Sequence, residues 1–166
     1  MNKLILMVGN IGTGKTTTAK LLMKDNLNIL TLDNDTIATM LNGGHYGHDI
    51  WTDKHWPLYS AIKITCTRLI LEAGFDVILD GTHMSKSSRK RFIDIGKELA
   101  SPVIVYVHRN AEEGLIRRLK EPRGSSLDVW KEVHRKFAVK YEEPTIEEGI
   151  QTIFDGEFME EIASAN

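Results

Sequence analysis

The sequence predicts an α/β fold in which helices cross over between the strands of a parallel β-sheet. Short apolar runs bounded by turn residues recur along the chain, and helical patterns fill the gaps between them. The length of 166 residues is that of a single domain, so we expect one domain spanning residues 1–166.

The strands and helices are expected to alternate along the chain. Apolar runs predict strands over 4–8, 29–32, 77–79 and 103–107, with a weaker fifth over 150–154. Helical spacing predicts helices over 15–24, 35–41, 55–73, 86–100, 111–120 and 127–141. Two segments, 42–53 and 121–126, fit neither pattern. We interpret them as surface loops, or else as the substrate loops and lids that α/β enzymes carry.

The composition is that of a folded globular protein without a strong electrostatic bias. Apolar residues make up 42% and charged residues 27% of the chain, and 21 basic against 23 acidic side chains leave a net charge of −2. No global basic field draws the protein to nucleic acid or to a membrane. The single cysteine cannot form an internal disulfide, and no apolar run approaches the ~20 residues of a membrane span. We therefore expect a cytoplasmic protein with no membrane partner.

The spacing around the cysteine also predicts which face of the third expected helix is buried. Cys66 shares helical spacing with other apolar side chains, namely Ile62, Leu69, Ile70 and Ala73. This spacing predicts that the stripe faces the core and that the thiol is buried rather than nucleophilic.

A glycine-rich motif follows the first expected strand. Residues 9–16 match G-x-x-x-x-G-K-[ST] in full and continue into a helix. Glycines let the backbone curl so that successive N–H groups point at one phosphate, and the helix N-terminus adds partial positive charge. We expect a nucleoside triphosphate to be bound here, with Lys15 as a catalytic lysine at its β- and γ-phosphates and Thr16 as a Mg²⁺ ligand. The residues expected to bind the nucleotide are Gly9, Asn10, Ile11, Gly12, Thr13, Gly14, Lys15, Thr16 and Thr17. The alternative is a plain glycine-rich turn.

A carboxylate after the third strand supports a metal site. Asp80 directly follows the apolar run over 77–79, where it is expected to hold Mg²⁺ or to orient Thr16. The alternative for a single Asp after a strand is a loop cap.

The end of the second strand carries the candidate base. The elements of a switch GTPase, D-x-x-G and N-K-x-D, are absent from the sequence, and the chain is short for a motor ATPase, which leaves small phosphotransferases. Such an enzyme needs a base, and residues 32–35, Leu-Asp-Asn-Asp, should open beside the glycine-rich loop. We favour Asp35 over Asp33 because Asp35 begins a helical stretch. The alternative is that Asp35 only caps that helix.

Arginines around Pro122 are candidates for phosphate contacts from a lid. Of the three arginines there, we expect Arg118 and Arg123 to be catalytic and assign no such role to Arg117. The alternative for each single arginine is a solvated helix face. A second basic stretch consists of Lys86, Arg89, Lys90 and Arg91. We interpret this stretch as helix surface rather than as a nucleic-acid contact.

Together these residues resemble the polynucleotide-kinase-like P-loop phosphotransferases, small ATP-binding kinases of AAA type that include phage 5′-hydroxyl polynucleotide kinases. The likeness covers most of the chain: the motif at 9–16, Asp35, the run Val-Ile-Leu-Asp-Gly-Thr-His at 77–83, Arg118 with Arg123, and residues 141–145 with 148–149. The resemblance implies a P-loop NTPase fold, a three-layer sandwich with strand order 2-3-1-4-5 and a helical lid. It also implies that ATP binds with Mg²⁺, that Asp35 activates a 5′-hydroxyl, and that Arg118 and Arg123 contact the donor phosphates.

The departures from the family concern the acceptor. Ala38 stands where the family has an arginine three residues after the base, Asn34 replaces a further arginine, and His83 replaces an asparagine. The two arginines would have helped to hold the substrate phosphate, so the acceptor contacts are altered.

The stretch 43–56 is rich in aromatic side chains and histidines. It contains His45, Tyr46, His48, Trp51, His55 and Trp56. The aromatic rings either stack on an acceptor base or anchor the loop to the core, and we favour the anchor. A zinc site formed by its histidines would lack thiolates and a fourth ligand.

The leading hypothesis is ATP-dependent transfer of the γ-phosphate to the 5′-hydroxyl end of DNA or RNA. The alternative on the same scaffold is a kinase for a small hydroxylated metabolite, a sugar nucleotide or an antibiotic. From a different class, the chain would be a nucleotide-responsive binding module. Asp35 argues against this third hypothesis, because a pure binder needs no base.

Overall fold

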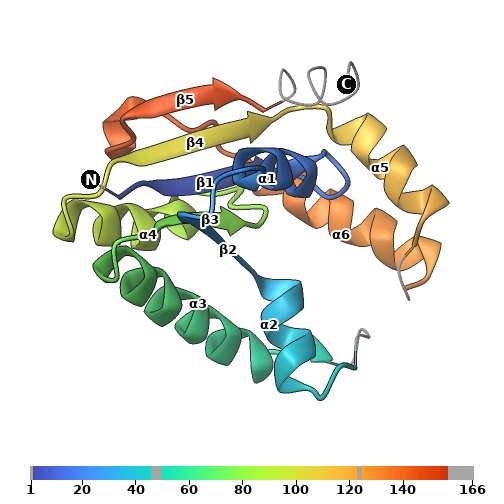
Figure 1. Ribbon diagram of the computed structural model, residues 1–166. Coiled ribbons are helices and arrows are strands. Elements are labelled where there is room, and N and C mark those ends of the chain that lie inside the picture. Colours follow the sequence, from blue (N-terminus) through green and yellow to red (C-terminus); the bar gives the residue numbers. More distant parts are fainter. Residues whose placement is uncertain (1, 46–49, 123–124, 157–166) are drawn as a thin grey trace.

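The computed structural model describes residues 2–45, 50–122 and 125–156, and it confirms the predicted α/β fold (Figure 1). Five parallel strands form one sheet in the order β2-β3-β1-β4-β5. The strands are β1 (Leu4–Gly9), β2 (Ile29–Asp33), β3 (Asp76–Asp80), β4 (Val103–His108) and β5 (Thr152–Asp155). The strand order implied by the resemblance is therefore confirmed.

All six predicted helices are present. They are α1 (Lys15–Met23), α2 (Asn34–Leu41), α3 (His55–Glu72), α4 (Lys86–Glu98), α5 (Ala111–Lys120) and α6 (Leu127–Val139), and a 3₁₀ helix, η2 (Ile146–Glu148), precedes β5. None of the helices in the described part of the chain combines the length and the apolar character that crossing a membrane requires.

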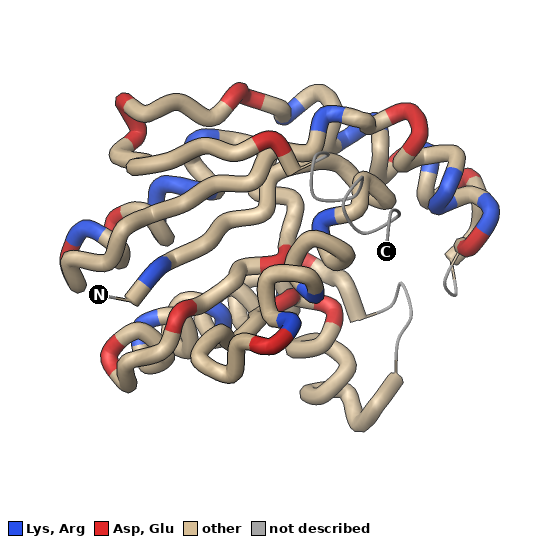
Figure 2. Tube along the Cα trace, turned by 45° about the horizontal axis from the view of Figure 1, so that its top comes forward, with Lys and Arg blue, Asp and Glu red and all other residues tan. Residues whose placement is uncertain are grey.

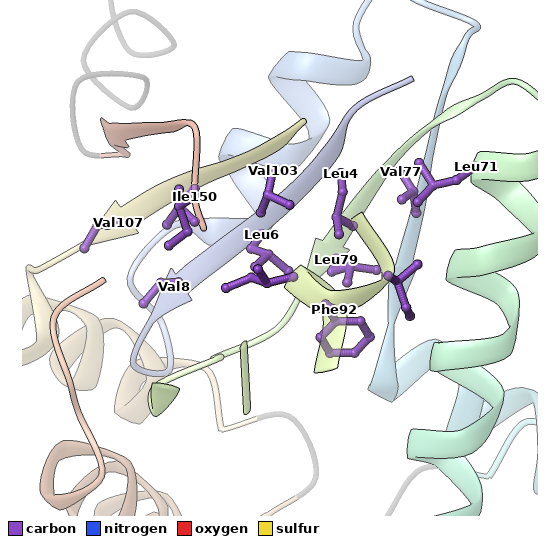
Figure 3. Packing of buried hydrophobic residues seen from close by; sticks show 13 residues of the cluster. Leu4, Leu6, Val8, Leu71, Val77, Leu79, Phe92, Val103, Val107 and Ile150 are labelled. Carbon is purple, nitrogen blue, oxygen red and sulfur yellow. The ribbon is translucent and has the colours of Figure 1, made fainter. Parts of the chain in front are cut away.

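Alternate side chains of the strands face two different helical layers. Leu4 and Leu6 of β1 point to the face that α3 and α4 cover, where they pack with Phe92 of α4 (Figure 3). Ile5 of β1 points to the opposite face and meets Ala19 of α1. Because both faces of the sheet are buried, its strands are almost uniformly apolar, and the domain has three layers.

The register brings polar strand ends together at one edge. Gly9 at the end of β1 pairs with His108 of β4, and Asp33 of β2 pairs with Asp80 of β3. Ligands of open α/β sheets bind at the carboxyl ends of the strands. The candidate residues of three separate sequence segments therefore meet at one edge.

The buried face of α3 differs from the prediction. The side chains that face the interior are Tyr59, Lys63, Thr67 and Leu71, whereas Cys66 is only half-buried and Leu69 is 57% exposed. The expected stripe is therefore wrong for Leu69 and for a fully buried Cys66, whereas Ile62 and Ile70 do pack against core clusters. Polar residues on the buried face, Lys63 and Thr67, hide its apolar periodicity.

Candidate functional site

The glycine-rich loop between β1 and α1 is closely packed against neighbouring backbone. Gly12 has a φ of +70°, and a Cβ there would lie 2.0 Å from the carbonyl oxygen of Gly114 in α5. Gly14 is the N-cap of α1 in the left-handed conformation, and no side chain caps this helix. The first N–H groups of α1 thus keep the orientation that binds an anion.

Lys15 lies over the loop. Its side chain is buried, and its ammonium donates a hydrogen bond to the Asn10 carbonyl and lies 3.4 Å from Thr13 Oγ1. The loop places a cation and a ring of backbone donors around one point, which is the arrangement that phosphate recognition requires.

Thr16 and Asp80 come together as predicted. The Thr16 hydroxyl donates to Asp80 Oδ2 at 2.6 Å, although 64 residues separate them in the sequence. A hydroxyl and a carboxylate are hard oxygen ligands, and Mg²⁺ is usually held by one or two such protein groups together with waters and phosphates. This pair therefore fits a Mg²⁺ ion at a bound nucleotide.

The start of α2 separates the roles of two aspartates. Asp33 is the N-cap, because its Oδ1 accepts from the Thr36 amide at 2.7 Å. Asp35 lies in the first turn with its side chain exposed. Capping was the alternative role for Asp35, and Asp33 performs it instead.

Lys63 of α3 is a site residue that the sequence analysis missed. Its ammonium is buried and lies 3.4 Å from the Asp80 carbonyl oxygen. Burial lowers the pKa of Lys63 to about 8, against the attraction of Asp80, Asp33 and Asp35. The amine therefore lies in the field of all three carboxylates at this edge, and only the polar interruption in the stripe of α3 signals its position.

His83 is part of the protein interior rather than an exposed acceptor contact. Its Nδ1 donates to the carbonyl oxygen of Met7 in β1 at 2.8 Å, and its ring meets Phe92 edge-on. Burial, followed by the charge of Lys63, holds the pKa of His83 well below its usual value. A neutral imidazole thus connects the loop after β3 to the strand that carries the phosphate loop.

The helices α5 and α6 form the side of the site next to the loop. Asn10 Nδ2 donates to the carbonyl of His134 in α6 at 3.0 Å, and Gly114 of α5 lies against the loop. The guanidinium of Arg118 lies 4.9 Å from the ring centroid of Trp130, a cation–π contact between the two helices. Arg123 lies outside the described residues.

Arg117 is exposed, and Asn110 connects it to the loop. With its amide oriented to satisfy both neighbours, Asn110 donates to the Thr13 carbonyl at 3.3 Å and accepts from Arg117 Nη2 at 3.0 Å. The positive charges of Lys15 and Arg117 also contribute to lowering the pKa of the buried His108 to about 4, after burial itself. Arg117 is therefore a further cation near the glycine-rich loop.

The second basic stretch is not a uniform helix surface. Arg89 is wholly buried and forms a bidentate pair with Glu148, whereas Lys90 is exposed and pairs with Asp94 one turn away. The interpretation of Arg89 as surface is therefore wrong. Figure 2 shows the general pattern: charges of both signs lie on the outer helices, and the strands carry charge only near their ends.

The aromatic segment is anchored to the core by Trp51, in agreement with the favoured interpretation, whereas Trp56 is 42% exposed. Trp51 packs against a buried cluster that includes Ala38 and Tyr59, and its ring centroid lies 4.9 Å from that of Trp56. Tyr46 and His48 lie outside the described residues. In the parts of the chain that the structure describes, no group of three His, Cys, Asp or Glu side chains is suited to a metal ion.

Comparison with known proteins gives one family and a common fold. A family model described as AAA domain matches residues 4–144. No curated protein matches the chain. The solved structures named below are less than 25% identical in sequence to this chain, so their similarity shows the fold alone.

Three of these structures represent different activities. A chain of the Pnkp1/Rnl/Hen1 RNA repair complex is 19% identical with a TM-score of 0.64, and the match covers 85% of this chain but 46% of that one. The *Mycobacterium tuberculosis* APS kinase CysC is 13% identical, with a TM-score of 0.65 and coverage of 98% and 96%. A sugar kinase from Janibacter sp. is 18% identical, with a TM-score of 0.61 and coverage of 99% and 94%.

Proposed function

Since the chain belongs to the AAA domain family, we propose that it is an ATP-dependent phosphotransferase that moves a γ-phosphate to a hydroxyl group. One juxtaposition carries the proposal. The phosphate loop with its Thr16–Asp80 pair shares one sheet edge with Asp35, a carboxylate that is not the helix cap. A protein that only binds nucleotide has no need of that carboxylate.

Each part of this edge has a separate task in the proposed reaction. The loop amides and Lys15 bind the donor phosphates, and Asp35 accepts the proton of the attacking hydroxyl. Thr16 and Asp80 would hold Mg²⁺, which neutralises phosphate charge when bound. Arg118 and Arg123, with Arg117 as a further candidate, would stabilise the charge of the transferred phosphoryl group.

We propose the 5′-hydroxyl end of DNA or RNA as the acceptor. The sequence resemblance supports it, and so does the fold similarity to a chain of an RNA repair complex. A small hydroxylated acceptor is the second candidate. It is favoured by fold similarity to sugar and APS kinases over almost their whole length.

A transfer assay tests the function. The protein is incubated with Mg²⁺, γ-labelled ATP and either 5′-hydroxyl oligonucleotides or a panel of sugars and nucleosides, and the labelled product is identified. Label on the oligonucleotide supports the leading acceptor, and label on a small molecule supports the second. Label on neither, despite ATP binding, would favour the nucleotide-responsive binding module.

The base assignment has its own test. Asp35→Asn is expected to slow transfer by about 10²- to 10⁴-fold while ATP affinity stays unchanged, because the amide cannot accept the proton. Asp94→Asn on the exposed side of α4 is the matched control. Wild-type transfer rates in Asp35→Asn would reject the assignment.

A further inference from the structure

Lys63 is a buried cation with unused hydrogen-bonding capacity. Its side chain is 3% exposed, and an ammonium has three N–H donors. Among the described residues, the hydrogen bond that its ammonium makes is the long one of 3.4 Å to the Asp80 carbonyl. A buried charge with so few partners is costly for the fold, so its retention points to a ligand that uses the remaining donors.

The ammonium lies directly against the backbone at the end of β3. The next residue after Asp80 is Gly81, and a Cβ there would lie only 3.2 Å from Lys63 Nζ and 3.0 Å from the ring of His83. Any larger residue would crowd both side chains. The glycine therefore lets the ammonium lie close to the strand end that carries Asp80.

A second cation lies on the same side. Arg91 of α4 donates from Nη1 to Ser60 Oγ of α3, which turns its guanidinium toward this helix. Lys63 Nζ and the Arg91 guanidinium lie 5.9 and 5.4 Å from the centroid of the Phe92 ring. By contrast, α2, the helix that carries Asp35, has no basic residue. The positive charge that acts on the proposed base therefore comes from Lys63 of α3, and Arg91 of α4 lies near enough to Lys63 to help lower the pKa of its amine.

We propose that Lys63 is a specificity-determining residue of the acceptor site and that its ammonium binds a phosphate-type oxyanion next to the hydroxyl that Asp35 activates. The inference rests on the proposed phosphotransfer and narrows its acceptor to a molecule that carries phosphate beside its reactive hydroxyl. Arg91, which is more exposed than Lys63, adds a second positive charge near the same Phe92 ring.

Binding measurements test this role without requiring transfer. A nucleoside 3′-monophosphate and the corresponding uncharged nucleoside are titrated by calorimetry into the full chain saturated with Mg²⁺ and a non-hydrolysable ATP analogue. Lys63→Met is expected to weaken the affinity for the monophosphate by about 10- to 100-fold, because the charged hydrogen bond to the phosphate is lost. The affinity for the uncharged nucleoside should stay unchanged. Lys63→Arg should retain part of the affinity.

The controls separate this role from a structural one and from the donor site. Lys90→Met, an exposed lysine on α4, should leave both affinities unchanged. Equal losses for both probes, a loss of ATP-analogue affinity, or no change in Lys63→Met would overturn the inference, as would wild-type protein that binds neither probe. If the selective loss occurs but no acceptor is phosphorylated, the phosphotransfer proposal fails while the anion site stands.

Discussion

Two buried cations, Arg89 of α4 and Lys63 of α3, differ in how many protein groups satisfy their charge. Arg89 donates to both carboxylate oxygens of Glu148, at 2.9 and 2.8 Å, and to the carbonyls of His83 and Met84. Lys63 has one long contact to a backbone carbonyl. Both charges were removed from water at a cost in free energy, but only for Arg89 is that cost offset by protein groups.

The difference distinguishes a structural charge from a functional one. The pair of Arg89 with Glu148 joins α4 to η2 and holds the loop after β3, so it fixes the shape behind the site. Among the described residues, Lys63 forms no ion pair comparable to that of Arg89 with Glu148. It lies at the edge of the sheet where substrates are expected. An unsatisfied buried charge is a better pointer to a ligand than a satisfied one.

Breaking the satisfied pair should give the largest effect. Glu148→Gln removes the partner charge and leaves the Arg89 guanidinium buried without a counter-ion, which we expect to lower the free energy of unfolding by about 3–5 kcal/mol. Urea denaturation measures this change. The matched control is Glu98→Gln, which breaks an equally bidentate but exposed pair with Arg68 and should leave stability unchanged. Similar midpoints for the two variants would contradict the structural role of Arg89.

Removing the charge of Lys63 should change the free energy of unfolding in the opposite direction. The pKa of Lys63 falls from 10.5 to about 8 on burial, so Lys63→Met is expected to raise the free energy of unfolding by about 3 kcal/mol at pH 7. The unfolded chain holds the Lys63 proton more strongly than the folded chain, so wild-type stability rises with pH between about 8 and 10.5. The advantage of Lys63→Met should shrink over that range. A variant that is less stable than wild type at pH 7 would show that Lys63 is structural after all.

The comparison also explains what the sequence could and could not predict. The loop at 9–16 was located because its chemistry depends on residues that are adjacent in the chain, and the strands because burial on both faces makes them continuously apolar. Lys63 was missed because periodicity assumes an apolar buried face, and α3 buries a lysine and a threonine. Arg89 was assigned to the surface because its partner, Glu148, is 59 residues away and only the tertiary fold brings it close.

The connection of Arg117 to the loop is not predictable for a related reason. A run of arginines at a helix end looks uniformly solvated. The Asn110 amide accepts from Arg117 and donates to Thr13, and this bridge depends on how α5 follows β4. Local motifs are therefore predictable from the sequence. Which charged side chains of a helix are buried or lie at the site depends on the tertiary fold and is not predictable in this way.

The buried side chain of His108 gives a smaller test of how burial without hydrogen-bond partners affects stability. His108 lies beneath the phosphate loop, and in the described chain neither ring nitrogen has a hydrogen-bond partner within range. Burial, with the charge of Lys15, lowers its pKa from 6.5 to about 4. The unfolded chain therefore takes up a proton as the pH falls from 6.5 toward 4 while the folded chain does not, and stability decreases over that range. His108 should account for about 2 kcal/mol of the loss between pH 7 and pH 5.

His108→Gln should remove that part of the loss in urea denaturation at the two pH values, whereas His55→Gln at the start of α3 should not. Some acid sensitivity should remain in His108→Gln, because the pKa of the buried His83 is lowered in the same direction. An unchanged pH dependence in His108→Gln would mean that the ring finds a partner when protonated.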